Sequence, residues 1–569
     1  MALQRMLLDI SPAKFPFRAR TVEHQVLAGG RVGMFGDSAE SSPSAAWIEN
    51  FWALAGGQQA AIVAEYGAIP DLPAEVTAQF GVSRIVAPRV FRSDSGASIA
   101  VITDTQVWLY SIGGWVKVMD SPVNVPTSTC ILKGETYIHQ FGGSLQKISA
   151  PSETDPVFSQ VEAVTTTGVT FAEMISICAA VSYLIATDGT SVYWSAPLDP
   201  TYWLPDGIGD QFGAGATKIL AVSGSIRFLL PTVDGFYVLT DSNVVYARYS
   251  GDAENPWIFT EVANSSGTVS HWAVSGSTNM AAAFIWCDNG LASISGSQAN
   301  YGFPEVTEFL AGSVLETFNT VVNEVESVLN ATPDFQLSFL GGRFLTISYG
   351  ELEQVREYIL VFDTLVQKWS RIAIDHVAVL DIRQDAADQG ITFENWLDTF
   401  ENSLYTFSEM GGASASSDVK AITLGVICAD GKIKRLSPVD LHTLDNFPQD
   451  YVDLTFSVLP NVMYFADLKA TRNREISLNE VSCFYTYPAF PTDGDPDTEN
   501  TQYSSLDTDI EGYSQEDPTI RGYLLSQARS NEEFYVERVV GTRVSLALKN
   551  VSSLQGVEIG FTITGTRRI

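Results

Sequence analysis

The chain has 569 residues, with 33 Lys and Arg against 66 Asp and Glu, so its formal net charge at pH 7 is −33. Hydrophobic residues make up 45% of the chain and charged residues 17%, which excludes a disordered chain and allows a large buried core. The acidic excess also excludes a surface that grips nucleic acid, because such affinity comes from Lys and Arg that neutralise phosphates.

The sequence has no run of about 18 apolar residues, so we expect no membrane-spanning segment. Asp9, Lys14 and Arg18 interrupt the apolar character of the first twenty residues, which therefore do not resemble a signal peptide. These features predict synthesis in a cytosol.

Residues 1–91 show little regular alternation and are expected to form an N-terminal arm of irregular and extended chain. Lys14–Arg20 and Pro70–Pro73 have the composition of an arm and a loop, and Trp47–Ala61 is compatible with a short helix.

Residues 92–450 contain a repeated pattern of an apolar run, a turn and an alternating run that ends in Ser or Thr. Each copy predicts a β-hairpin, because Asp-Gly and Asn-Gly supply the positive φ of tight turns and the alternation buries one face. The copies are Ala100–Ser111, Tyr137–Ser149, Tyr183–Ser195, Phe228–Thr240, Phe284–Ser295, Tyr358–Ser370 and Gly425–Ser437, with a weaker one at Phe400–Ser408.

The early copies recur at the roughly 40 to 50 residues of a propeller blade. We therefore predict a mainly β protein built on a β-propeller of six to eight blades. A β-sandwich or a stack of hairpins is the alternative.

A helical insertion is expected near residues 306–335. Within Ser313–Asn330 the apolar residues recur at spacings of four and three, and Ser313 and Glu316 have the spacing of a capping box. This helix either lies on its own blade or packs against a neighbouring subunit. The residues of its candidate interface are Val314, Phe318, Val321, Val325 and Val328.

Residues 451–569 are expected to form an additional C-terminal β domain, interrupted by an acidic loop over 487–520. The first three aspartates of this loop match ligand positions of an EF-hand, but Thr498 and Ser504 replace the required Gly and Glu, so a solvated, repelling loop is favoured over a calcium site. The candidate residues of a lumen or tip loop are Asp493, Asp495, Asp497, Glu499, Asp507, Asp509 and Glu511.

No pattern of catalytic or metal-binding residues stands out. The five cysteines and five histidines are isolated, and the nucleophile elbow, the Walker loop and the zincin motif are all missing from the sequence. A pair of glycosidase carboxylates remains compatible with the sequence, although the sialidase Asp box is not reproduced. We expect free cysteines, no metal, no cofactor and no enzymatic activity.

One segment resembles a known family. Val192–Pro205 (VYWSAPLDPTYWLP) is similar to a stretch of the tail hub or nozzle proteins of short-tailed bacteriophages, also called packaged-DNA stabilisation or tail tubular B proteins. The matching residues are Trp194, Ser195, Asp199, Pro200 and Trp203. Lys218–Thr240 and Val557–Arg568 also resemble that family. The alternative is an aromatic cap over a blade turn, as in unrelated propellers.

The resemblance implies a structural virion protein that forms a ring, expected to be a hexamer, below the portal and adaptor proteins. Such a ring extends the channel, retains packaged DNA, conducts it during ejection without specific binding, and carries tail fibres or spikes. Assembly would take place in the host bacterial cytoplasm. The alternatives are a carbohydrate-binding or carbohydrate-cleaving propeller and a generic protein-interaction propeller.

Overall fold

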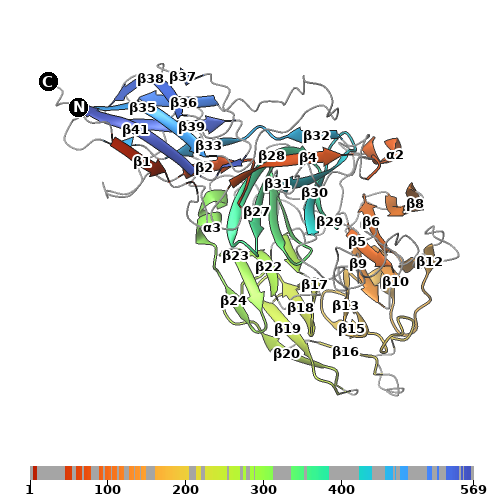
Figure 1. Cartoon of the computed structure of the whole chain (residues 1–569). Coiled ribbons are helices and arrows are strands. Elements are labelled where there is room, and N and C mark those ends of the chain that lie inside the picture. The colour runs from red at the N-terminus through yellow and green to blue at the C-terminus, as the bar shows by residue number, and fades with distance from the viewer. Residues whose placement is uncertain are drawn as a thin grey trace, which may run out of the picture.

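The computed structural model describes the chain in segments, and all structural statements refer to them. These are residues 4–8, 10, 45–53, 59–66, 69–78, 89–93, 96–103, 106–111, 114–120, 127–132, 135–140, 142–148, 161–203, 213–218, 224–252, 255–268, 273–276, 282–287, 289–311, 335–350, 355–383, 422–438, 455–465, 468–469, 475–484, 509–514, 522–524, 533–541, 543–549, 553–554 and 556–564. Strands dominate, and Figure 1 shows two groups of them.

The larger group is a β-propeller. Five of its blades are separate four-stranded antiparallel sheets that follow one another along the chain. Their strands are β5 (Arg89–Ser93), β6 (Gly96–Ile102), β7 (Gln106–Ser111) and β8 (Gly114–Asp120); β9 (Thr127–Leu132), β10 (Glu135–Gln140), β11 (Leu145–Ile148) and β12 (Val161–Ala163); β13 (Ser176–Ala180), β14 (Tyr183–Thr187), β15 (Val192–Trp194) and β16 (Gly215–Thr217); β17 (Ile226–Thr232), β18 (Gly235–Thr240), β19 (Val244–Tyr249) and β20 (Trp257–Glu261); β21 (Val274–Gly276), β22 (Ala282–Cys287), β23 (Gly290–Ser295) and β24 (Gln298–Asn300).

Two further blades are parts of larger sheets. The sixth comprises β25 (Phe335–Leu340), β26 (Phe344–Tyr349), β27 (Arg356–Asp363) and β28 (Lys368–His376). The seventh takes three strands from late in the propeller and a fourth from near the N-terminus: β29 (Ala378–Arg383), β30 (Ile422–Ile427), β31 (Ile433–Pro438) and β4 (Gln59–Tyr66). The described residues thus form seven blades, within the predicted range of six to eight.

All seven strong hairpin predictions are confirmed as antiparallel pairs. They correspond to β6–β7, β10–β11, β14–β15, β17–β18, β22–β23, β27–β28 and β30–β31. The weaker copy, Phe400–Ser408, lies outside the described residues.

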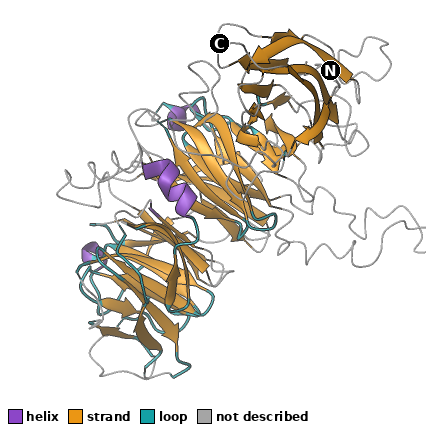
Figure 2. Cartoon of the chain, turned by 90° about the vertical axis from the view of Figure 1, so that its left-hand side faces the viewer, coloured by secondary structure: helices purple, strands orange, loops and turns teal. Residues whose placement is uncertain are grey.

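A second β domain extends from the outer edges of blades six and seven (Figure 2). One of its sheets has the order β1 (Gln4–Leu8), β41 (Gly556–Thr564), β35 (Glu475–Phe484) and β38 (Glu533–Gly541). The other continues from β28 through β2 (Ala45–Glu49), β33 (Val462–Phe465), β39 (Arg543–Lys549), β36 (Asp509–Ser514) and β37 (Gly522–Leu524), with β34 (Leu468–Lys469) also on β39. On β4 lie β3 (Phe51–Ala53), β32 (Thr455–Val458) and β40 (Ser553–Leu554).

This arrangement corrects the expectation for residues 1–91. The described residues of Trp47–Ala61, which are 47–53 and 59–61, contain parts of β2, β3 and β4, and none of them is helical. The N-terminal strands belong to the sheets of both domains instead of forming a separate irregular arm, because β1, β2 and β4 have pairing partners more than 300 residues later in the chain, and β3 pairs with β4.

Helices are few and short in the described segments: α2 (Ala74–Thr77), the 3₁₀ turn η2 (Phe171–Glu173) and α3 (Pro304–Ala311). None is long and apolar enough to cross a membrane. Helix α3 lies at the start of the predicted helical insertion, whereas Ser313–Asn330 itself lies outside the described residues.

Candidate functional site at the junction of the two domains

The predicted site residues are described only in part. Asp493, Asp495, Asp497, Glu499 and Asp507 lie outside the described residues, as do Val314, Phe318, Val321, Val325 and Val328. Asp509 and Glu511 lie in β36, which pairs with β39, so this part of the predicted acidic loop is a strand within a sheet. Its acidic residues are thus compatible with strand pairing, which composition alone did not indicate.

Residues 192–203, the described part of the segment that carries the phage resemblance, lie at the seam between blades two and three. Trp203 is 1% exposed and packs against Phe171, with ring centroids 5.2 Å apart. Its Nε1 donates to the carbonyl of Pro200 at 2.5 Å, and Asp199 accepts bonds from the backbone and hydroxyl of Thr201 at 3.0 and 2.6 Å. These contacts explain the motif as a folded cap between blades.

The two described buried histidines are structural. His376 Nδ1 lies 2.7 Å from the carbonyl of Ile374, which can only accept, so Nδ1 carries the proton and Nε2 accepts from the Ser348 hydroxyl at 2.8 Å. His139 Nε2 donates to the carbonyl of Phe171 at 2.8 Å. Burial lowers the pKa of His376 to about 3 and that of His139 to about 4, so both rings are neutral at physiological pH.

Cys130, Cys178, Cys287 and Cys428 form no disulfide, as expected. Burial raises the pKa of the Cys178 thiol and brings that of Cys428 to about 11, which keeps both thiols protonated. Within the described segments, no group of three or more His, Cys, Asp or Glu side chains is placed to hold a metal ion.

A buried ion pair lies where the second domain meets blade six. Arg371 on β28 is 1% exposed and pairs with Glu49, which lies at the end of β2. Arg371 Nε donates to the Tyr349 hydroxyl at 2.9 Å, and its guanidinium lies 3.8 Å from the centroid of the Tyr358 ring. A buried guanidinium needs such partners to offset its lost hydration.

Asn50 links three parts of the chain at the same place. Its Nδ2 donates to the carbonyl of Pro460 at 2.6 Å, and its Oδ1 accepts from the backbone of Ala373 at 2.7 Å. Its backbone φ of 60° lies in the left-handed region, which Asn tolerates better than most residues. This geometry turns the chain from β2 into β3 and ties both to blade six.

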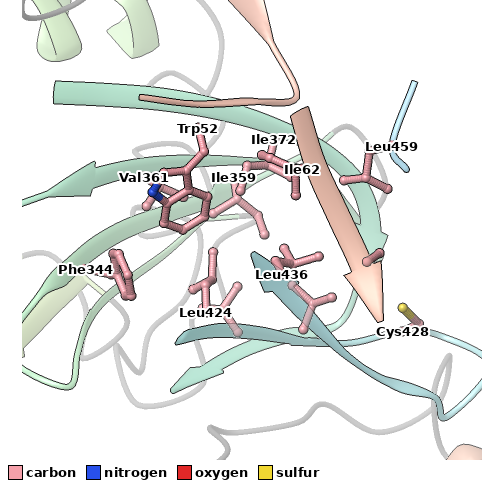
Figure 3. Packing of buried hydrophobic residues seen from close by; sticks show 13 residues of the cluster. Trp52, Ile62, Phe344, Ile359, Val361, Ile372, Leu424, Cys428, Leu436 and Leu459 are labelled. Atoms are coloured by element: carbon pink, nitrogen blue, oxygen red, sulfur yellow. The ribbon is translucent and has the colours of Figure 1, made fainter. Parts of the chain in front are cut away.

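A second buried pair holds the outer strand of blade seven. Glu65 on β4, with its side chain 1% exposed, accepts from Nε of Arg435 on β31 at 2.9 Å. Around it, residues of β3, β4 and blades six and seven form one apolar core, which includes Trp52, Ile62 and Leu436 (Figure 3). The edge of Trp52 meets Phe344 at a centroid distance of 5.4 Å.

The segment after β4 continues across to blade one. Leu72 donates its backbone N–H to the carbonyl of Gly431 on blade seven at 2.9 Å. Glu75 on α2 accepts from Gln106 and Lys117 of blade one at 2.6 and 3.1 Å, and these bonds lower the pKa of Glu75. We call residues 69–77 the clamp segment, because they join blade seven to blade one.

The junction can hold the second domain and the N-terminal strands in place on the propeller, since its charged groups are already paired with one another. Sequence reasoning did not identify Glu49, Arg371, Glu65 or Arg435. No local signal could have found them, because partners 322 and 370 residues apart look like ordinary surface charges in the sequence.

No family model matches the chain, and a search of curated proteins found no match. Among solved structures, the chain is similar to apo AztD from Citrobacter koseri, with 10% identity, a TM-score of 0.29 and coverage of 50% of this chain and 86% of that one. It is also similar to BamB from Moraxella catarrhalis, with 10% identity, a TM-score of 0.30 and coverage of 68% and 96%.

A third similar structure is the β-propeller domain of Cps50 (Swd1) from Myceliophteria thermophila, with 12% identity, a TM-score of 0.28 and coverage of 51% and 83%. With scores this low, the assignment rests on the sheets of the chain itself. The protein is a β-propeller with an additional β domain.

Proposed function

We propose that the chain is a structural subunit of the tail nozzle or hub ring of a short-tailed bacteriophage. In this role, a ring of subunits extends the channel of the portal and adaptor, retains packaged DNA and conducts it during ejection. The observation that carries the proposal is the resemblance of the segment Val192–Pro205 to that family, and residues 192–203 of this segment lie between two blades of a propeller. The resemblance implies a propeller-containing subunit, and the fold agrees with that expectation.

The net charge of the chain and its buried ion pairs support the same role. A net charge of −33 on each subunit would make a ring strongly negative, so that DNA slides through the channel without adhering. The buried pair Glu49–Arg371 joins the second domain to blade six, and the pair Glu65–Arg435 holds β4 on β31 within blade seven. Both contacts suit a wall that bears mechanical load. We assign the protein to the virion, with the adaptor, fibres or spikes and further copies of itself as partners, and propose no catalytic role.

A protein-interaction propeller that forms no ring is the second candidate. It is favoured by the exposed aliphatic side chains on one propeller face, which are described in the next subsection.

The mass of the purified protein in solution, alone and with a candidate adaptor ring, distinguishes the two. We expect a closed ring, alone or on the adaptor, visible by negative-stain microscopy. A protein that stays monomeric and does not bind the adaptor ring would contradict the proposed nozzle function. A glycan-binding and glycan-cleavage screen would then test the carbohydrate alternative.

A further inference from the structure

Large apolar side chains that remain exposed in the propeller gather on one of its faces. Each lies in or beside the connection between the first and second or the third and fourth strand of its blade. In a propeller these connections share one face, because the innermost strands all run in the same direction. The residues, with exposed fractions, are Ile131 (39%), Val181 (51%), Leu198 (43%), Val233 (54%), Ile258 (47%) and Leu365 (51%).

Five of the six lie on the consecutive blades two, three and four, and we call them the apolar patch: Ile131, Val181, Leu198, Val233 and Ile258. Leu198 donates its backbone N–H to the carbonyl of Ser182 at 2.6 Å, which places it beside Val181. Ile258 pairs with Arg248, which pairs with Gly235, so the Val233 turn lies about 10 Å away, two strand spacings. The second domain joins blades six and seven, away from this patch.

An aromatic cluster supports the patch at the seam of blades three and four. Trp257 meets Phe236, Tyr183 and Tyr249 at centroid distances of 4.8, 5.5 and 5.7 Å. The Trp257 indole N–H is buried and has no acceptor within the described structure. Such packing fixes the backbone of β20 and of the turn after β13, which carry Ile258 and Val181 of the patch, and a preordered surface costs a ligand less entropy on binding.

Two residues of the patch also have strained backbones. Val181 has a φ of 57° and Leu198 a φ of 60°, and a β-branched residue in the left-handed region is a true outlier. Strained conformations of this kind cluster at binding sites. Val181 lies in the two-residue turn between β13 and β14, and both aliphatic side chains are exposed to solvent.

The charges bordering the patch indicate what binds there. Among the described residues beside it, Asp199, Asp234 and Asp252 are exposed, against one exposed arginine, Arg248. A second copy that met this patch with its own patch would bring the same three aspartates against these, and like charges facing each other disfavour that contact. We propose that the apolar patch binds a partner protein that presents aliphatic side chains next to Lys or Arg. This inference goes beyond the proposed ring and does not depend on it.

The test uses a fluorescein-labelled peptide of alternating Leu and Lys, with an alternating Leu and Glu peptide for comparison. We expect the basic peptide to bind the full chain, measured by fluorescence anisotropy, and the acidic peptide to bind at least tenfold more weakly. The double variant Val233→Ser/Ile258→Ser should weaken binding of the basic peptide at least tenfold.

Leu365→Ser is the matched control, because Leu365 is equally exposed on the same face but lies on blade six. It should change affinity less than twofold, and unchanged unfolding midpoints would show that both variants fold. Failure of the basic peptide to bind, or equal affinities for the double variant and the control, would overturn the proposal. Self-association that the double variant abolishes would overturn it too, by making the patch a contact between copies.

Discussion

The buried pair of Glu49 and Arg371 is the most consequential single contact between the domains. If Glu49→Ala removes the carboxylate, Arg371 keeps its charge at 1% exposure without its acidic partner. Loss of one partner of a buried pair costs about 3–5 kcal/mol, so we expect the junction to unfold at clearly lower urea concentration.

Urea unfolding followed by circular dichroism measures this effect. The control is Arg5→Ala, which breaks the exposed Arg5–Glu558 pair at 3.8 Å and should cost less than about 1 kcal/mol. Equal effects of the two variants would show that the buried pair does not hold the domains together.

The buried histidines make the free energy of unfolding depend on pH. The pKa of His376 is about 3 in the folded chain against an ordinary 6.5, so below pH 6.5 the unfolded chain takes up a proton that the folded chain does not. Stability is therefore complete above pH 6.5 and falls as the pH drops toward 3, by about 2 kcal/mol at pH 5 for this residue.

Comparing wild type with His376→Gln at pH 8 and pH 5 isolates this contribution. The loss of stability between the two pH values should be smaller in the variant by about 2 kcal/mol, whatever the variant's stability at pH 8. An identical pH dependence in both proteins would be inconsistent with a buried neutral His376.

At the scale of elements, the clamp segment is expected to depend on Gly431. This glycine has a φ of 87°, and an added Cβ would collide with Cγ2 of Thr77. Gly431→Ala should therefore destabilise more than Gly251→Ala, where φ is 80° and the added Cβ meets nothing within 4 Å. The control substitution should cost only the left-handed backbone penalty of about 1–2 kcal/mol.

Thr77→Ser removes the colliding methyl group and should return the Gly431→Ala variant to the level of the control. Thermal unfolding midpoints of the three variants report the comparison. If Thr77→Ser gives no rescue, the contact between α2 and the blade-seven turn does not exist as described.

At the scale of the whole molecule, the propeller is completed by its N-terminal strand. Removing residues 1–68 deletes β4 and leaves blade seven with three strands and an open edge. We expect this truncated chain to aggregate or to be cleaved rapidly by protease. Removing only residues 1–10 deletes the edge strand β1 and should leave a compact propeller.

Size-exclusion chromatography and limited proteolysis distinguish these outcomes. A monomeric, protease-resistant chain lacking residues 1–68 would show that the propeller closes without β4.

The β-hairpins are the features that the sequence predicts best. The hairpins with Asp188-Gly189 and Asp430-Gly431 were predictable, because a turn and the alternation on either side lie within about a dozen residues. The sequence also predicts a propeller and a second β domain, because the hairpin pattern recurs at the length of a blade over residues 92–450 and is lost over residues 451–569.

Only the tertiary structure decided which distant segments pair. The sequence of Trp47–Ala61 is compatible with a short helix, and its strands could not be recognised because the partners of β2 and β4 on β28, β33 and β31 lie hundreds of residues away. Likewise, Arg371 and Glu65 resemble solvated charges in the sequence, and the exposed valines resemble core residues. The sequence by itself determined the hairpins, because turn chemistry and alternation act over short range, whereas burial and domain joining depend on contacts that exist only once the sheets assemble.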